Sequence, residues 1–232
     1  ADWILNGGID EEWDYLSEKN GEVRAFRLPF NQAKYFDQYQ DSLSSENKRR
    51  YHFDRRNYMS EMLEKARKYE FIQGQQIKEE ERPAFHITPY VGWMNDPNGF
   101  SYYKGEYHLF YQYNPYSTHW DSMHWGHVVS KDLLHWNYVP TALAPDEDYD
   151  KIGCFSGSAI ELDDGRQLLI YTAVDQETLE DGTARDIQTQ AVAVGDGKNY
   201  KKYEKNPVLT AKDLPEGASK VDFRDPKIWK GK

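Results

Sequence analysis

The sequence has 232 residues, enough for one large domain, or for a smaller domain with an extension, and in either case for a substantial hydrophobic core. It contains 29 basic and 39 acidic residues, which gives a net charge of −10. No block of basic residues is interleaved with aromatics, so a nucleic-acid partner is not expected. No run of about 18 apolar residues occurs, so no membrane span is expected. The single cysteine, Cys154, allows no intrachain disulfide and favours the cytoplasm.

Residues 1–82 are predicted to form an N-terminal extension. Its first fifty residues contain no functional motif, although 9–16 (IDEEWDYL) and 26–36 (FRLPFNQAKYF) are weak candidates for short strands, and 42–58 are polar and charged. Between Arg55 and Arg82 apolar residues recur at helical spacing among Glu, Lys and Arg, which predicts an amphipathic helix. Pro83 is expected to stop that helix.

From Phe85 onward the apolar pattern changes to a period of two, which is typical of strands. Five such runs are 106–113, 123–130, 154–162, 167–174 and 189–195, and Asp-Gly turns at 163–165 and 195–197 are each expected to close a hairpin. Repeated four-stranded meanders form a propeller at about 40–50 residues per blade. Residues 83–232 therefore predict an all-β fold with room for about three blades.

Two aspartates precede prolines, in GWMNDPNGF (92–100) and in DFRDPKIW (222–229). By local rules each lies in a turn, and Asp96 or Asp225 alone is more often structural than catalytic. Arg224 beside Asp225 favours its ionised form. Two Asp-Pro turns beside aromatics in a strand-rich region suggest a shared rim, and a pair of carboxylates flanking a bond is what glycoside hydrolysis requires.

The motifs between these aspartates are rich in groups that hydrogen-bond hydroxyls or stack on sugar rings. Gln112, Trp120 and Ser156 are the members expected to touch a ligand. Each also has a structural alternative: a capped strand end, a core tryptophan and a turn serine, respectively.

A metal or cofactor is not expected. His119, His124, His127 and His135 are close in sequence, but no thiolate or paired carboxylate at metal-site spacing completes a ligand set. Phosphate-loop and dinucleotide fingerprints are absent, and FSGSA lacks the Gly-x-Ser-x-Gly form of a serine nucleophile.

Five motifs in order resemble glycoside hydrolase family 32, the invertase and β-fructofuranosidase group: WMNDPNG (93–99), YQYNP (111–115), MHWGHVVSKDLLHW (123–136), CFSGSA (154–159) and DFRDPK (222–227). The resemblance covers about residues 83–232. It implies a five-bladed β-propeller, followed in full-length members by a β-sandwich, that releases terminal β-D-fructofuranosyl units from sucrose or short fructans without a cofactor.

Carried over position by position, the resemblance implies that Asp96 is the nucleophile and Asp225 the transition-state stabiliser. It places six residues in the fructose pocket: Asn95, Gln112, Trp120, Phe155, Ser156 and Arg224.

The family's general acid is a Glu in a Glu-Cys motif, whereas the only cysteine of this sequence follows Gly153. We therefore expect the 232-residue polypeptide to be the N-terminal part of an enzyme, nearly inactive alone, with open propeller edges that favour self-association. A sugar-binding relic without activity and a fructosyltransferase are the alternatives.

Overall fold

The computed structural model describes residues 59–231, so the candidate strands at 9–16 and 26–36 and the polar segment 42–58 lie outside the described residues. The helical elements are α5 (Glu61–Gly74), η1 (Glu79–Glu81) and η2 (Ala211–Asp213). The strands are β1 (Trp93–Tyr103), β2 (Glu106–Asn114), β3 (His124–Ser130), β4 (Trp136–Leu143), β5 (Gly153–Glu161), β6 (Gln167–Thr178), β7 (Ala184–Gly195) and β8 (Tyr200–Lys202). Among the described residues, no helix has the length and apolar character needed to cross a membrane.

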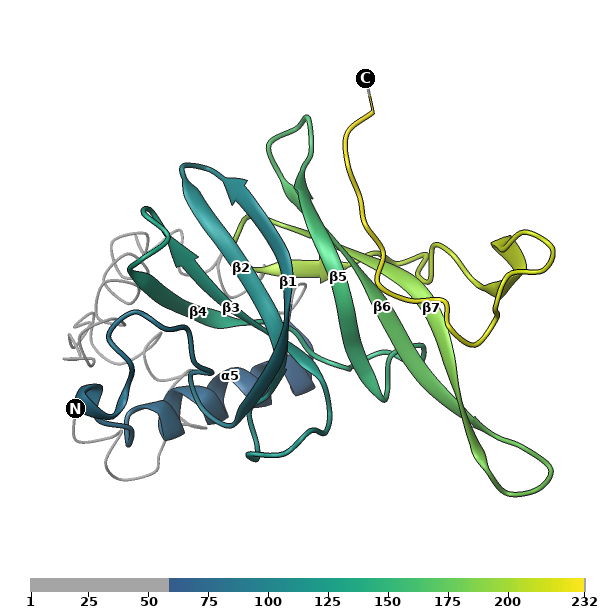
Figure 1. Cartoon of the computed structure of the whole chain (residues 1–232), viewed down its shortest axis with the longest axis horizontal. Coiled ribbons are helices and arrows are strands. Elements are labelled where there is room, and N and C mark those ends of the chain that lie inside the picture. The colour runs from purple at the N-terminus through teal and green to yellow at the C-terminus, as the bar shows by residue number, and fades with distance from the viewer. Residues whose placement is uncertain (1–58, 232) are drawn as a thin grey trace, which may run out of the picture.

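The eight strands form two antiparallel sheets, each a meander in chain order, β1-β2-β3-β4 and β5-β6-β7-β8. The edge strands β1 and β5 lie side by side where the sheets meet (Figure 1). This is the arrangement of two neighbouring propeller blades, in agreement with the fold class that the sequence predicts. Residues 203–231 add only the short helix η2, and the last of them cross the second sheet (Figure 1).

The five predicted strands all form, as β2, β3, β5, β6 and β7. Both predicted hairpins form as well: the Leu162 N–H donates to the Arg166 carbonyl at 2.8 Å, and the Asp196 N–H donates to the Asn199 carbonyl at 3.2 Å. Strands β1, β4 and β8 were not predicted from the sequence. Strand β8 has only three residues, the apolar alternation of β4 is interrupted by Pro140, and β1 contains the residues predicted as a turn.

The predicted turn around Asp96 is wrong, because residues 93–103 form strand β1. Its register against β2 shifts between Met94 and Pro97 and again between Asn98 and Ser101, so each interval holds one extra residue on β1. These are β-bulges, and a bulge on an edge strand tolerates a proline that has no N–H to donate. Asp225 is not in a turn either; it lies in a stretch without regular secondary structure.

The larger core lies between the two sheets. Phe110 and Trp125 of the first sheet are fully buried against Leu169, Tyr171 and smaller side chains of the second. Burial of about 25 cal/mol per Å² of apolar surface makes this contact the main force that holds the sheets together. This packing sets the position of β1 relative to β5, because Phe110 is paired with Asn98 of β1 and belongs to the same core as Ala159 of β5.

Helix α5 packs on the flank of the first sheet. The sequence predicts a helix between Arg55 and Arg82; within the described residues it begins after the cap Ser60, whose Oγ accepts the Leu63 N–H at 3.1 Å, and ends at Gly74. Leu63 and Ala66 are buried as the apolar pattern predicts. Arg67 Nε donates to the Thr141 carbonyl at 2.9 Å, which anchors the helix to β4.

Glu70 is an acidic residue that the helix buries. Its Oε1 accepts the Thr141 N–H at 2.8 Å and its Oε2 accepts the Thr141 hydroxyl at 2.7 Å. Burial raises the pKa of Glu70 to about 7, against the opposing effect of these hydrogen bonds. The helical pattern could not reveal this burial, since Glu normally lies on the solvent face.

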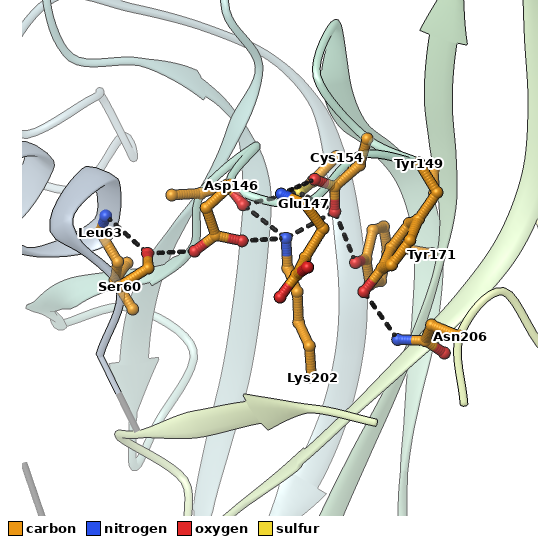
Figure 2. A network of polar contacts seen from close by, with 12 residues as sticks. Ser60, Leu63, Asp146, Glu147, Tyr149, Cys154, Tyr171, Lys202 and Asn206 are labelled. Atoms are coloured by element: carbon orange, nitrogen blue, oxygen red, sulfur yellow. Dashed lines mark hydrogen bonds and ion pairs between the residues drawn. The ribbon is translucent and has the colours of Figure 1, made fainter. Parts of the chain in front are cut away.

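A network of ion pairs and hydrogen bonds joins the N-cap of α5 to the loop between β4 and β5 and to the second sheet (Figure 2). Ser60 Oγ donates to Asp146, which also pairs with Lys202 of β8, and Lys202 pairs in turn with Asp150. Tyr171 Oη donates to Asp150 at 2.8 Å. Burial lowers the pKa of Lys202, but neighbouring acidic groups outweigh burial and the net shift is upward. The amine therefore stays charged within the core.

Candidate active site

The candidate site begins where β1 meets β5. Ser156 Oγ donates a hydrogen bond to Asp96 Oδ2 at 3.1 Å, and the next residue, Gly157, donates its N–H to Asn98 Oδ1 at 3.2 Å. A Cβ at Gly157 would overlap the Ile170 carbonyl of β6, so glycine is needed for β5 to lie this close to β6 at the bulge. Two neighbouring residues of one sheet thus fix the bulged strand of the other.

The bulge in β5 also turns its backbone toward side chains of other strands. Register with β6 shifts between Cys154 and Gly157, which frees carbonyls from the ladder. The Cys154 carbonyl accepts from Gln112 Nε2 at 3.1 Å, and the Phe155 carbonyl accepts from Trp125 Nε1 at 3.1 Å. Side chains of β2 and β3 therefore fix the backbone of β5 at Phe155 and Ser156.

Asp225 is tied to the same backbone from the other side. Its N–H donates to Thr172 Oγ1 at 2.8 Å, and Thr172 Oγ1 donates to the Ser156 carbonyl at 3.2 Å. Because Ser156 Oγ reaches Asp96, the two predicted catalytic aspartates are connected through only two residues, Ser156 and Thr172. Asp225 has a φ of 61°, a left-handed conformation that is uncommon outside glycine.

Arg224 lies near Asp225 but pairs more closely with another carboxylate. Its Nη1 is 2.8 Å from Asp222 Oδ1, whereas its Nε is 3.9 Å from Asp225 Oδ2. All three side chains are about half exposed or more, so solvent weakens both pairs. Asp96 is exposed as well, and both aspartates are thus open to a ligand from solution.

The structure brings most of the predicted pocket residues to this junction. Trp120, in the loop between β2 and β3, meets Phe155 edge to face with ring centroids 6.0 Å apart, and its side chain is 54% exposed. An exposed aromatic ring of this kind suits stacking against a sugar ring. Asn95 is exposed on β1 next to Asp96, whereas Gln112 is buried and bonded to β5.

Three further residues that organise the site were missed from sequence: Thr172, Asn98 and Trp125. Thr172 is a fully buried polar residue within the apolar run of β6, and Asn98 is buried although it stands in an Asn-Gly pair typical of exposed turns. A buried polar side chain needs a hydrogen-bond partner, so burial is the property that would have marked these residues as parts of the site. Their burial cannot be recognised from the sequence.

The four clustered histidines occupy separate environments. His127 Nε2 lies 3.0 Å from His108 Nδ1 in the core, and His135 Nδ1 lies 2.7 Å from Asp132 on the surface. Burial lowers the pKa of His108 to about 4 and that of His124 also to about 4. Within residues 59–231, no three or more His, Cys, Asp or Glu side chains are grouped so that they could hold a metal.

Two neighbouring four-stranded antiparallel meanders define the class of a β-propeller protein. Residues 86–232 match the family described as "Glycosyl hydrolases family 32 N-terminal domain". The chain belongs to glycoside hydrolase family 32.

Its relatives act on fructosides according to their names. The chain is 46% identical over 151 residues to a sucrose-6-phosphate hydrolase of Zymomonas mobilis, covering 64% of this chain and 28% of that protein. It is 44% identical over 155 residues to a levanase of Bacillus subtilis, covering 65% and 21%. The solved β-fructofuranosidase of Bombyx mori is 45% identical with a TM-score of 0.62, over 73% of this chain and 34% of that one. The chain thus spans about a third or less of the length of these relatives.

Proposed function

We propose that the protein to which this chain belongs hydrolyses terminal β-D-fructofuranosyl bonds in sucrose or short fructans. The observation that carries the proposal is the connection of Asp96 to Asp225 through Ser156 and Thr172, in a chain of glycoside hydrolase family 32. A mutant of the Bombyx mori relative is described in complex with sucrose, which supports a sucrose-sized ligand for this site.

In the proposed reaction, the Asp96 carboxylate attacks the anomeric carbon of the fructosyl unit, and the bond to the leaving oxygen breaks. The leaving oxygen takes a proton from a general acid. Water then attacks the same carbon from the side that the leaving group vacated and gives a proton to the conjugate base of the general acid, and Asp96 is released as a carboxylate. Two displacements give net retention of configuration.

The other residues assist this reaction by position. The Ser156 hydroxyl holds one carboxylate oxygen of Asp96, which leaves the second oxygen for attack. Asp225 binds fructosyl hydroxyls and balances the positive charge that develops on the ring, together with Arg224. Trp120 and Phe155 enclose the ring, and Asn95 lies beside the nucleophile.

The general acid is the one component without a counterpart among the 232 residues, since no Glu-Cys pair occurs in the sequence. We propose that a carboxylic acid supplied by a part of the protein outside these 232 residues protonates the leaving oxygen. A proton donor of this kind contributes about 10²- to 10⁴-fold in rate.

The test is to assay the complete gene product and its Asp96→Asn variant for fructose and glucose release from sucrose. We expect the wild type to release fructose. In the variant the rate should fall by about three or more orders of magnitude, as is typical when a nucleophile is removed. Asp181→Asn, an exposed carboxylate in the β6–β7 loop, is the matched control and should retain activity.

The stereochemistry and products refine the result. NMR of the first-formed fructose should show the β-furanose form, and high sucrose should give free fructose in preference to longer fructans. The proposal would be overturned by an inactive wild type, by an active Asp96→Asn variant or by an inverted product. If fructosyl transfer predominates, the protein is a fructosyltransferase and not a hydrolase.

A further inference from the structure

Residues 223–228 are held against one face of the second sheet by three polar side chains from three adjacent strands. Gln190 Nε2 of β7 donates to the Phe223 carbonyl at 2.7 Å. Ser158 Oγ of β5 donates to the Pro226 carbonyl at 2.8 Å and accepts the Ile228 N–H at 2.9 Å. Thr172 of β6 lies between them and accepts the Asp225 N–H.

These three side chains share a face because of the strand register. Thr172 is paired with Gln190, and Ser158 is paired with Ile170, which is two residues from Thr172. Paired residues and residues two apart point to the same side of a sheet. We call Ser158, Thr172 and Gln190 the Asp225 cradle.

Thr172 is the member of the cradle that connects to the nucleophile. Its single hydroxyl is both donor and acceptor, to the Ser156 carbonyl at 3.2 Å and from the Asp225 N–H at 2.8 Å. Ser156 then reaches Asp96 with its own hydroxyl at 3.1 Å. One fully buried oxygen therefore links the Asp225 backbone to the backbone of Ser156, the residue that holds the Asp96 carboxylate.

The conformation of Asp225 makes this support necessary. A non-glycine residue at φ 61° is strained, and this conformation persists only where the surrounding structure holds it. If φ relaxes, the carboxylate moves with the backbone. The hydrogen bond from the Asp225 N–H to Thr172 is the contact that opposes this relaxation directly, and the cradle bonds at Phe223 and Pro226 hold the chain on either side.

We propose that Thr172 is a positioning residue, which with the rest of the cradle sets the Asp225 carboxylate relative to Asp96 for fructosyl transfer. The inference rests on the proposed fructosidase function. Thr172 itself does not touch substrate; it acts through the backbone of Asp225 and Ser156. Its effect should fall mainly on the transition state, in which interactions with sugar hydroxyls strengthen.

The test compares Thr172→Val, which keeps the shape but removes the hydroxyl, with Thr172→Ser, which keeps the hydroxyl, in the complete gene product. We expect Thr172→Val to lower kcat about 10- to 100-fold while KM changes much less, as for a displacement of a reacting group. Thr172→Ser should keep kcat within about threefold of the wild-type value. The matched control is Thr189→Val, which removes another buried threonine hydroxyl, bonded to the Ala173 carbonyl of β6 at 3.5 Å, and should leave kcat unchanged.

A second measurement is independent of activity. Hydrogen exchange of the Asp225 amide should be faster in Thr172→Val than in wild type and in Thr189→Val. If the wild type releases no fructose, the proposed function fails while the exchange result still decides whether the cradle exists. Should Thr172→Val not fold, Gln190→Met decides in its place, with an expected loss of several-fold in kcat.

Two results would overturn the inference in an active enzyme. One is an unchanged kcat in folded Thr172→Val, or in Gln190→Met where the former does not fold. The other is an equal loss in Thr172→Ser and Thr172→Val, since that would show that the shape of the side chain and not its hydroxyl is what matters.

Discussion

Ser156 and Asp96 are 60 residues apart in the sequence and lie on different sheets, yet the Ser156 hydroxyl donates directly to the Asp96 carboxylate at 3.1 Å. Both residues stand at bulges, in β5 and β1 respectively. Bulges change the direction in which a side chain points, and two facing bulges bring these groups together. The contact gives the proposed nucleophile a fixed neighbour that belongs to the next blade.

Ser156→Ala should slow the enzyme by removing this donor. A hydrogen bond to a charged group contributes about 1.5–3 kcal/mol, so kcat should fall about 10- to 100-fold in the complete gene product. Steady-state kinetics on sucrose measures the effect, with thermal melting to verify folding. Ser101→Ala removes a hydroxyl from β1, the strand that carries Asp96, and should leave kcat unchanged. Equal kinetics for Ser156→Ala and wild type would show that Asp96 needs no such neighbour.

Lys202→Met should destabilise the fold. The substitution leaves the carboxylates of Asp146 and Asp150 buried without their cation, and breaking a buried pair in this way costs about 3–5 kcal/mol. Urea unfolding of the complete gene product measures the loss. Lys201→Met, at the exposed neighbouring position of β8, should change the free energy of unfolding by less than about 0.5 kcal/mol. A similar midpoint for both variants would mean that the ion network contributes nothing to stability.

Glu70 should give the protein a pH-dependent stability. Its pKa is about 7 in the folded state against an ordinary 4.5, so between these values the folded protein keeps a proton that the unfolded chain has lost. The contribution of Glu70 is therefore most favourable below about pH 4.5 and declines as the pH rises to about 7. The full change is about 3 kcal/mol at 1.36 kcal/mol per pKa unit.

Glu70→Gln isolates this contribution because the amide can bond Thr141 and does not titrate. The free energy of unfolding of the variant minus that of wild type should rise by about 3 kcal/mol between pH 4.5 and pH 7.5. Buried histidines titrate in both proteins and cancel in the difference. Glu61→Gln, at an exposed position in the first turn of α5, is the matched control for the loss of a carboxylate on this helix. A flat difference for Glu70→Gln would show that burial does not raise the pKa of Glu70 in the folded protein.

The 232-residue polypeptide by itself should hydrolyse sucrose at least about 10²-fold more slowly than the complete gene product, since it carries no counterpart of the general acid. A fructoside with an activated aryl leaving group separates this cause from poor folding. Such a leaving group needs no proton, so the deficit should shrink if the acid is what is missing. Comparable sucrose hydrolysis by the polypeptide, verified intact by mass, would contradict the prediction.

Much of this fold was visible in local patterns. The period-two runs predicted five strands, and the Asp-Gly turns at 163–165 and 195–197 predicted two hairpins that form. Strand propensity and turn chemistry are local properties, so they act on a few neighbouring residues and can be recognised without the rest of the chain. The same locality explains the error at Asp96, where Asp-Pro and Asn-Gly favour a turn but pairing with β2 imposes a bulged strand.

The strand-rich blades, the family and the two aspartates of the proposed chemistry can be predicted from residue types and short spacings. The contact of Ser156 with Asp96, the support of Asp225 by Thr172 and the burial of Glu70 are visible only in the folded chain. These relationships join residues about 50 to 70 positions apart and arise when two sheets and a helix bury a shared core. Which polar groups that burial brings together depends on bulges and packing, and no local pattern encodes them.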